Sequence, residues 1–435
     1  MPDAIYIAFL FALGACVGSF LNVVVWRLPQ GESLITPPSH CPRCGKLLLW
    51  WDNIPILGWI KLGGKCRFCK QPISIRYPIV EAVTALLFVF YYVMIYMVHV
   101  GPPTPQQMAQ LSNPEPSLAM LHAMRPAIVP WPIFLLYIVF VSALLAASLI
   151  DAEFFIIPPG IPWLVAVLGL TVHTLVDHPW LAGALNLEVT AHGMAPTQPI
   201  SSSLAAGGTV GFLLSVLLHW RGLFSPSFPD GEPMLEVERE DRAAEIKQAK
   251  REGREPPKMP PEYTPRQIRA EMRKEMLFLL PPMALAIAWA VLTTRVPALA
   301  SLWHRATAHD WVTALLGSLL GGLIGGFVVW ITRILGTLVW GRLAMGLGDA
   351  DLMFAVGTVL GAGPATVAFF VAPFFGCLIA LYMILTKTRR EVPYGPYLSL
   401  ASAFVILFYT PIAAYLAPGV SVVAYYLLSP LSGGG

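Results

Sequence analysis

The chain has 435 residues, of which 56% are hydrophobic and 12% are charged, whereas an ordinary soluble domain carries about 25% charged residues. Its net charge is only +3, so the composition lacks the strongly basic character of nucleic-acid-binding proteins. Repeated apolar runs are long enough to cross a bilayer as helices. The composition therefore predicts an all-α polytopic membrane protein. The alternative, a large soluble protein, would need several long helices that are apolar on every face.

The apolar runs predict about ten membrane-spanning helices. In chain order they lie at about 4–25, 79–98, 130–150, 161–178, 201–220, 278–294, 312–335, 350–362, 365–386 and 397–417. The run around Cys16 continues to Trp26, which favours an uncleaved spanning helix over a lipoprotein signal. Pro364 and its neighbouring glycines are expected to turn the chain after the short span 350–362.

The basic residues of the short loops predict the orientation. Eight lysines and arginines lie between Trp26 and Pro78, whereas the loop from about 99 to 129 has one, Arg125. Because positive loops stay in the cytoplasm, the first loop is expected there and the N-terminus outside. Counting alternate crossings also places the loops near 151–160, 221–277, 336–349 and 387–396 in the cytoplasm.

The segment 225–277 differs from the rest of the chain. It holds twelve acidic and eleven basic residues, and its middle is rich in strong helix formers of mixed charge, which predicts a solvated helix. The favoured interpretation is a solvated spacer without chemistry, and the alternative is a docking surface for a partner.

Four cysteines form two C-x2-C pairs, "CPRC" at 41–44 and "CRFC" at 66–69. Four thiolates at this spacing predict a closed tetrahedral zinc site, which is structural because it has no open position. The ligands would be Cys41, Cys44, Cys66 and Cys69. Two disulfides are the alternative, but thiols of a cytoplasmic loop stay reduced. Cys16 and Cys377 lie within spans and are expected to be packing residues.

Acidic residues near the predicted membrane surface form a second pattern. Asp151 and Glu153 follow the third span, and Asp349 and Asp351 follow the seventh span. The predicted topology brings both stretches to the cytoplasmic face. Two facing carboxylates can share a proton and activate water against a peptide carbonyl, which is aspartic peptidase chemistry. Helix capping by Asp349 or an ion pathway are the alternatives.

Two further features accompany the acids. Gly346 and Gly348 precede Asp349, and they would let backbone pass close to a helix or a substrate. Glu81, at the start of the second span, either lines the site or is an ordinary acid at a helix start.

These motifs together resemble the type IV prepilin peptidases, the membrane-embedded G-x-G-D aspartic proteases. The matching stretches are "GSFLNVVVWRLP" (18–29), the cysteine loop 40–81, "LIDAEFFIIP" (149–158), "AMGLGDADLM" (344–353) and "VPYGPYLSLA" (392–401). The resemblance implies cleavage of a basic leader from type IV prepilins or type II secretion pseudopilins at the cytoplasmic face of the bacterial inner membrane. Bifunctional relatives also N-methylate the new N-terminus with S-adenosylmethionine.

Carried over residue by residue, the resemblance implies that Asp151 and Asp349 are the catalytic pair and that the four cysteines bind zinc. Gly346 and Gly348 match the glycines of the G-x-G-D motif. Two positions depart from the family pattern: Pro159 stands where the family usually has Asp or Asn, and Asp351 where it usually has Lys. The family usually has eight spans, so the helices that flank 225–277 are expected to be an inserted pair.

The expected organisation follows from these features. A first membrane helix at 1–25 precedes the zinc-binding loop at 26–78, and membrane helices with the first catalytic Asp occupy 79–220. A charged insert at 221–277 precedes the helices at 278–435 that carry the GLGD motif. The expected partners are prepilin or pseudopilin substrates and membrane lipid, and no nucleic acid. The competing functions are an ion-coupled transporter and a non-catalytic zinc-loop scaffold for pilus assembly.

Overall fold

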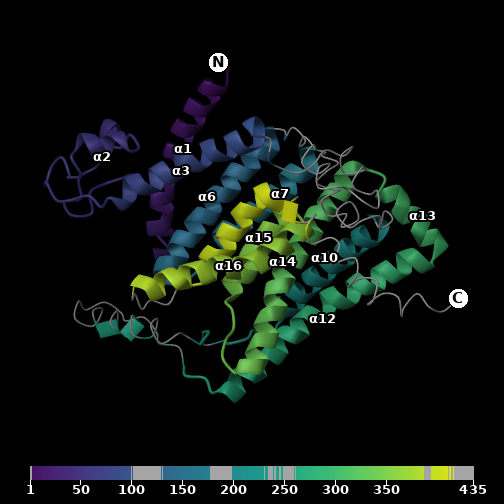
Figure 1. Cartoon of the computed structure of the whole chain (residues 1–435). Coiled ribbons are helices and arrows are strands. Elements are labelled where there is room, and N and C mark those ends of the chain that lie inside the picture. The colour runs from purple at the N-terminus through teal and green to yellow at the C-terminus, as the bar shows by residue number, and fades with distance from the viewer. Residues whose placement is uncertain are drawn as a thin grey trace.

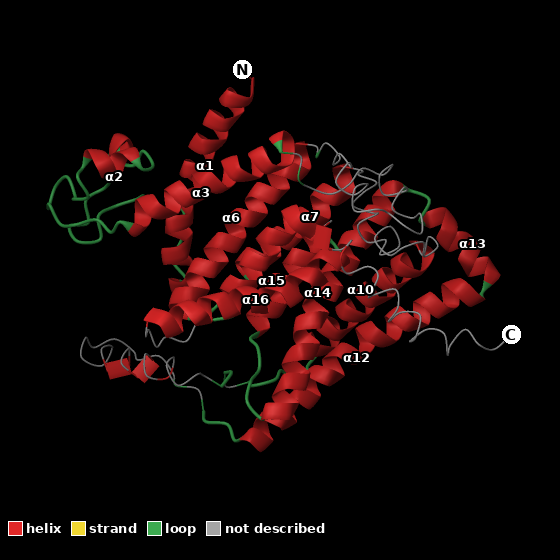
Figure 2. Ribbon diagram, in the orientation of Figure 1, coloured by secondary structure: helices red, strands yellow, loops and turns green. Residues whose placement is uncertain are grey.

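The computed structural model describes residues 2–98, 100, 129, 131–176, 198–229, 231–233, 239, 242–243, 246–247, 259, 261–386, 393–409, 411–412 and 415. Within these residues the regular elements are helices, and the cysteine loop adds two isolated β-bridges (Figure 2). The predicted all-α class is therefore confirmed.

Most of the described chain lies in one helical bundle (Figure 1). In chain order the α-helices are α1 (Pro2–Arg27), α2 (Leu57–Lys61), α3 (Arg76–Tyr92), α6 (Trp131–Phe154), α7 (Gly160–Val176), α10 (Gln198–Trp220), α12 (Pro265–Arg295), α13 (Pro297–Ala306), α14 (Asp310–Trp340), α15 (Leu347–Leu360) and α16 (Ala362–Thr386). A further helix runs from Gly395 to Tyr409. Helix α2 belongs to the cysteine loop, which stands outside the bundle beside α1 and α3 (Figure 1).

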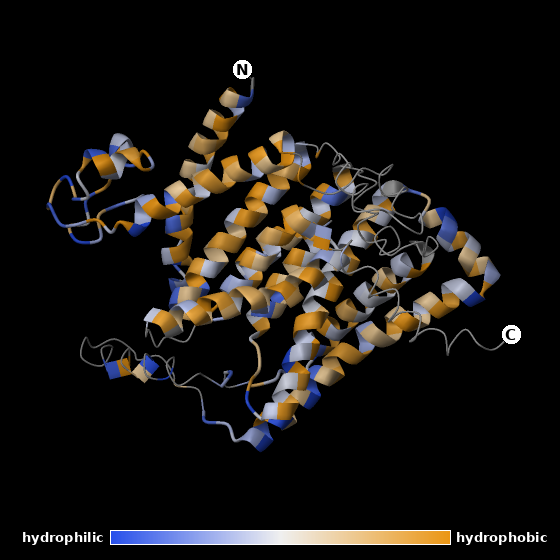
Figure 3. Cartoon of the chain, viewed as in Figure 1, coloured by the Kyte–Doolittle hydropathy of each residue, from blue (hydrophilic) through white to orange (hydrophobic). Residues whose placement is uncertain are grey.

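Each predicted span corresponds to a helix. Seven helices of the described chain are long and apolar enough to cross a membrane. The other three predicted spans correspond to the shorter helices α7, α15 and Gly395–Tyr409. Figure 3 shows apolar residues along the bundle and polar residues in the cysteine loop. The chain is a multi-pass membrane protein.

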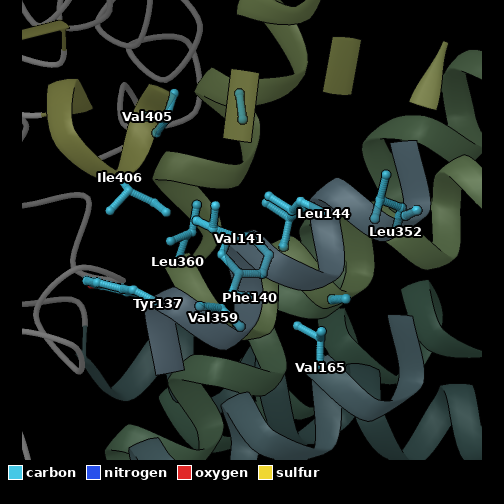
Figure 4. Close-up of a cluster of buried hydrophobic side chains, with 14 of the residues drawn as sticks. Tyr137, Phe140, Val141, Leu144, Val165, Leu352, Val359, Leu360, Val405 and Ile406 are labelled. Atoms are coloured by element: carbon cyan, nitrogen blue, oxygen red, sulfur yellow. The ribbon is translucent and has the colours of Figure 1, made fainter. Parts of the chain in front are cut away.

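The largest buried core joins the N-terminal and C-terminal helices. Helix α6 lies at its centre and is buried along most of its length. Figure 4 shows residues of α6, α7, α15 and Gly395–Tyr409 meeting in this core. Helices that are far apart in sequence therefore pack into one unit. Within it, Asp151 lies in the last turn of α6 and Asp349 lies in the first turn of α15.

Glycines set the closest helix contacts. A Cβ atom on Gly325 of α14 would lie 2.2 Å from the carbonyl oxygen of Met353 in α15, and one on Gly357 of α15 would lie 1.9 Å from that of Gly321. Only helices without side chains at these positions can approach so closely. The same device joins α10 to α12, since a Cβ on Gly207 would lie 2.3 Å from the carbonyl oxygen of Leu285. The helices predicted as an inserted pair thus pack against each other.

Both ends of the charged segment 225–277 pack against other parts of the protein. Helix α12 begins at Pro265, where Thr264 and Gln267 form a capping box, and it continues into the predicted span 278–294. Phe228 is buried with Ile268 and Met272 of α12. Most of the predicted solvated helix lies outside the described residues; its described positions 239, 242–243 and 246–247 are helical.

Candidate active site and metal centre

The two C-x2-C pairs fold into equivalent turns. In the first, the Cys41 backbone N–H donates to the Lys46 carbonyl and the Gly45 N–H donates to the Cys41 carbonyl, at 2.9 and 2.8 Å. In the second, the Cys66 N–H donates to Gln71 and the Lys70 N–H donates to Cys66, at 2.8 and 3.0 Å. Gly45 and Lys70 occupy matching left-handed positions, with φ of 68° and 58°. The left-handed position that Gly45 occupies in the first turn is therefore occupied by a lysine in the second.

The two turns bring the four sulfurs together. All four ligand atoms lie within 4.8 Å of one another, and the Cys41 and Cys69 sulfurs are 3.8 Å apart. The Cys69 and Phe68 backbone N–H groups donate to the Cys66 sulfur and lower the pKa of its thiol to about 6. The thiolate is the form that binds metals. The cluster can therefore hold a metal ion through four cysteines.

An ion pair braces the cysteine loop from within. The Arg67 guanidinium donates two hydrogen bonds to the buried Asp52 carboxylate, Nε to Oδ2 at 2.6 Å and Nη2 to Oδ1 at 2.5 Å. These bonds hold the pKa of Asp52 below its usual range, so its charge is retained at neutral pH. The Lys46 ammonium lies 4.8 Å from the centre of the Phe68 ring, which joins the first turn to the second.

Glu81 attaches this loop to α3, and Arg76 joins α3 to α6. The Glu81 carboxylate, on α3, accepts a hydrogen bond of 2.6 Å from the backbone N–H of Ile56 in the loop. Arg76 pairs with Glu153 of α6 at 2.6 Å. Both acids are thus engaged in supporting the loop or joining helices.

Asp151 lies in the last turn of α6 and is buried. Its Oδ2 accepts a hydrogen bond of 3.1 Å from the backbone N–H of Gly395, at the start of the helix Gly395–Tyr409. A Cβ atom on Gly395 would lie 2.4 Å from this oxygen. The absence of a side chain at Gly395 is therefore what lets its backbone approach the carboxylate.

Asp349 lies in the first turn of α15 and is also buried, whereas Asp351 is half-buried. Asp349 Oδ2 accepts a hydrogen bond of 3.3 Å from the Gly346 backbone N–H, which precedes the helix. The N-cap residue of α15 is Gly346 rather than Asp349; Asp349 is the third residue of the helix and accepts a hydrogen bond from the cap residue. A Cβ on Gly348 would lie 3.1 Å from Cβ of Ile157, so Gly348 packs against the stretch that follows Asp151.

A short segment joins the surroundings of the two aspartates. Gly395 bonds to Asp151, and its neighbour Tyr394 lies close enough to Asp349 for the carboxylate charge to act on it. Burial and, next, that charge raise the pKa of Tyr394 to about 12. Ile157 lies against both Gly348, which precedes Asp349, and Gly395, since its Cδ1 would lie 3.0 Å from a Cβ on Gly395. The fold thus brings the ends of α6 and α15 to one place.

Sequence reasoning assigned no role to Tyr394, Gly395 or Ile157. The stretch "VPYGPYLSLA" did mark the position of the first two, but a role in holding Asp151 depends on a contact between residues 244 positions apart.

Comparison with known proteins covers the N-terminal part of the chain. Residues 12–95 match the family model of the bacterial peptidase A24 N-terminal domain. A prepilin leader peptidase/N-methyltransferase of Myxococcus xanthus (strain DK1622) is 56% identical over 84 residues, which are 19% of this chain and 25% of the relative. A prepilin leader peptidase/N-methyltransferase of Klebsiella pneumoniae is 49% identical over 88 residues, which are 19% of this chain and 39% of the relative. An Escherichia coli O78:H11 protein, named type 4 prepilin-like proteins leader peptide-processing enzyme, is 46% identical over 93 residues. These are 17% of this chain and 35% of the relative.

These relatives are therefore matched over only 25 to 39% of their own length. No solved structure matches the chain. The domain match contains the four cysteines and Glu81 and ends before Asp151. Over this N-terminal segment, the chain has the bacterial peptidase A24 N-terminal domain and is similar to prepilin leader peptidases.

Proposed function

We propose that the protein is a membrane-embedded aspartic endopeptidase that removes the leader peptides of type IV prepilins or type II secretion pseudopilins. The observation that carries the proposal is that Gly395 donates a hydrogen bond to Asp151, while Ile157 lies against both Gly395 and Gly348, the neighbour of Asp349. This arrangement supports a single site for two buried aspartates from distant helices. The names of the relatives support the substrate class.

The chemistry follows from a carboxylate pair that holds one proton. The ionised carboxylate takes a proton from water, and the water oxygen attacks the peptide carbonyl carbon. The protonated partner donates a hydrogen bond to the carbonyl oxygen. The C–N bond then breaks, and the departing amine takes up a proton from the pair. In this assignment Asp151 and Asp349 are the catalytic residues, and the glycines at 346, 348 and 395 provide the space around them.

The cysteine cluster is assigned a structural zinc ion, held by Cys41, Cys44, Cys66 and Cys69. Four thiolates suit zinc and leave no position for substrate. The proposal extends to N-methylation of the new N-terminus with S-adenosylmethionine, which rests on the names of the relatives alone.

The organisation proposed for the chain keeps the boundaries expected from sequence. The zinc loop 26–78 and the charged segment 221–277 face the cytoplasm of a bacterial inner membrane, and the two aspartates lie at that face. The eight basic residues of the first loop support this orientation.

The test is co-expression with a candidate prepilin in a host that lacks its own peptidase, followed by mass spectrometry of the substrate N-terminus. Loss of the leader supports peptidase activity, and a further methyl mass supports transfer. Asp151→Asn and Asp349→Asn should each abolish cleavage while the protein still inserts. If Asp349→Asn cleaves at the wild-type rate, the assignment of the pair is wrong. Proton-coupled uptake in vesicles without any cleavage would favour a transporter, and a dyad that can be changed without effect would favour a scaffold.

A further inference from the structure

The two ends of the charged segment 225–277 meet at one buried arginine. Arg333 lies near the end of α14, and its side chain is fully buried. Its guanidinium contacts Glu232, from the first end of the segment, and Glu275, from α12 at the other end. A solvated spacer, the interpretation that the sequence favoured for this segment, would not be expected to contact a buried arginine with both of its ends.

The donors of Arg333 are fully used. Nε and Nη2 donate to the Glu275 carboxylate at 3.1 and 3.0 Å, and Nη2 also donates to Glu232 at 2.9 Å. Nη1 donates to the Met345 carbonyl oxygen at 2.5 Å and to Glu232 at 3.5 Å. A guanidinium has five N–H donors in a rigid planar arrangement. The two carboxylates therefore fix the orientation in which Nη1 reaches Met345.

Met345 is adjacent in sequence to a residue that contacts Asp349, the candidate catalytic residue. The next residue, Gly346, donates its backbone N–H to Asp349 Oδ2 at 3.3 Å. The charges of Arg333 and Glu232 also act on the Asp349 carboxylate. One chain of contacts thus runs from the charged segment through Arg333 to the residue that precedes the helix of Asp349.

The remainder of the connection between α14 and α15 is held from the same side. Arg269 of α12 donates to the carbonyl oxygens of Leu338 and Val339, at 2.9 and 3.2 Å, at the end of α14. Thr337 accepts a hydrogen bond of 3.2 Å from the Ala344 backbone N–H. Residues 341–346 are therefore held at both ends: α12 contacts the first end through Arg269, and the second end through Glu275 and Arg333.

Glu232 itself is held by an ordered stretch. The backbone N–H of Phe228 donates to Glu271 of α12 at 3.1 Å, and the Phe228 side chain is buried. Lys274 pairs with the same Glu271 at 2.8 Å. The Glu232 side chain is 37% exposed, so it reaches Arg333 from the edge of the network.

We propose that Glu232 and Glu275 act through Arg333 as positioning residues for Asp349, so that the charged segment helps to set the geometry of the peptidase site. The proposal rests on the proposed function only in assigning Asp349 to catalysis. A buried ion pair is weak grounds for a stability role, because desolvation offsets much of its attraction. An arginine held by two carboxylates against one backbone carbonyl instead gives a defined orientation.

The experiment compares three single carboxamide variants in the membrane-embedded full chain. Glu232→Gln removes a ligand of Arg333 and is the main variant, because a half-exposed position tolerates substitution. Glu271→Gln removes a carboxylate that holds the same stretch but does not contact Arg333. Glu262→Gln alters a surface pair with Arg239 in the same segment. Each is assayed for prepilin cleavage, with kcat separated from KM, and for the amount inserted in the membrane.

The expected result is a fall in kcat of roughly tenfold or more for Glu232→Gln with KM unchanged, because small displacements of a catalytic group lower rates by such factors. Glu262→Gln should keep the wild-type kcat, and Glu271→Gln should lower it less than Glu232→Gln, because Glu271 holds the stretch but does not contact Arg333. Equal losses in Glu232→Gln and Glu271→Gln would show that only docking of the segment matters and would overturn the proposal. Wild-type kcat in Glu232→Gln would also overturn it.

A second readout does not depend on activity. Arg342 is exposed in the loop between α14 and α15, so the rate of tryptic cleavage after Arg342 reports how firmly the loop is held. We expect cleavage several-fold faster in Glu232→Gln than in Glu262→Gln; equal rates would contradict the proposal. If wild-type protein cleaves no prepilin, the proposed function fails, and the tryptic comparison still decides whether the charged segment holds this loop.

Discussion

The backbone N–H of Gly395 donates to the carboxylate of Asp151 across 244 positions of sequence, at 3.1 Å. This bond places the start of the last described helix against the end of α6. Tyr394, one residue earlier, lies close enough to Asp349 for the carboxylate charge to act on it, so the same turn lies near both candidate catalytic residues.

Substitution of Gly395 by Ala should damage the site directly. The new Cβ would lie 2.4 Å from Asp151 Oδ2, so either the carboxylate or the helix must move. We expect prepilin cleavage to fall by roughly tenfold or more, since catalysis depends on close positioning. The control is Gly376→Ala, whose Cβ would meet only the Tyr397 ring at 3.6 Å, an ordinary contact. Equal activity of the two variants, measured at equal membrane levels, would contradict the role given to Gly395.

The cysteine cluster should bind about one zinc ion per chain, since four thiolates complete a tetrahedral site. Cys41→Ser should lower the zinc content measured by mass spectrometry of the purified protein. Cys377→Ser is the matched control, because Cys377 is exposed on α16, outside the cluster. Unchanged zinc in Cys41→Ser would remove Cys41 from the ligand set.

Loss of Arg67 should loosen the cysteine loop even with all four cysteines present. Arg67→Ala leaves the Asp52 carboxylate without its guanidinium partner, which removes two hydrogen bonds from within the loop. Partial exposure of Arg67, at 38%, reduces the effect. We expect faster zinc release to a chelator. Arg43→Ala, an exposed arginine within the first C-x2-C pair, should release zinc at the wild-type rate; similar rates in the two variants would rule out a bracing role for the Arg67–Asp52 pair.

Two neighbouring glycines of α14 provide a test of the helix packing. Gly325→Ala would place a Cβ 2.2 Å from the Met353 carbonyl oxygen, whereas Gly326→Ala would meet its nearest atom, Cβ of Phe354, at 3.4 Å. We expect Gly325→Ala to destabilise the protein by about 1–3 kcal/mol or more, as overpacking does. Gly326→Ala should change stability by less than about 1 kcal/mol. The measurement is unfolding in detergent, and a reversed order of the two variants would contradict the α14–α15 contact.

Several features of the fold follow from local patterns in the sequence. Apolar runs predicted the helices because the bilayer requires helices of a certain length and hydrophobicity. The C-x2-C pairs predicted the cluster because each pair offers two sulfurs from one turn. The predicted span 278–294 is the apolar part of a longer helix, α12 (Pro265–Arg295), because a charged helix can continue into an apolar one without a break in backbone hydrogen bonding.

The sequence by itself predicted which residues carry chemistry: the four cysteines, and the aspartates near the ends of two apolar helices. Only the tertiary structure decided their surroundings, namely Gly395 at Asp151, and Glu232 and Glu275 at Arg333, which contacts Met345 shortly before Asp349. Helix and turn patterns repeat over a few residues and can be recognised locally. A hydrogen bond between Gly395 and Asp151, or an ion pair between Glu232 and Arg333, depends instead on how whole helices pack, which no local pattern records.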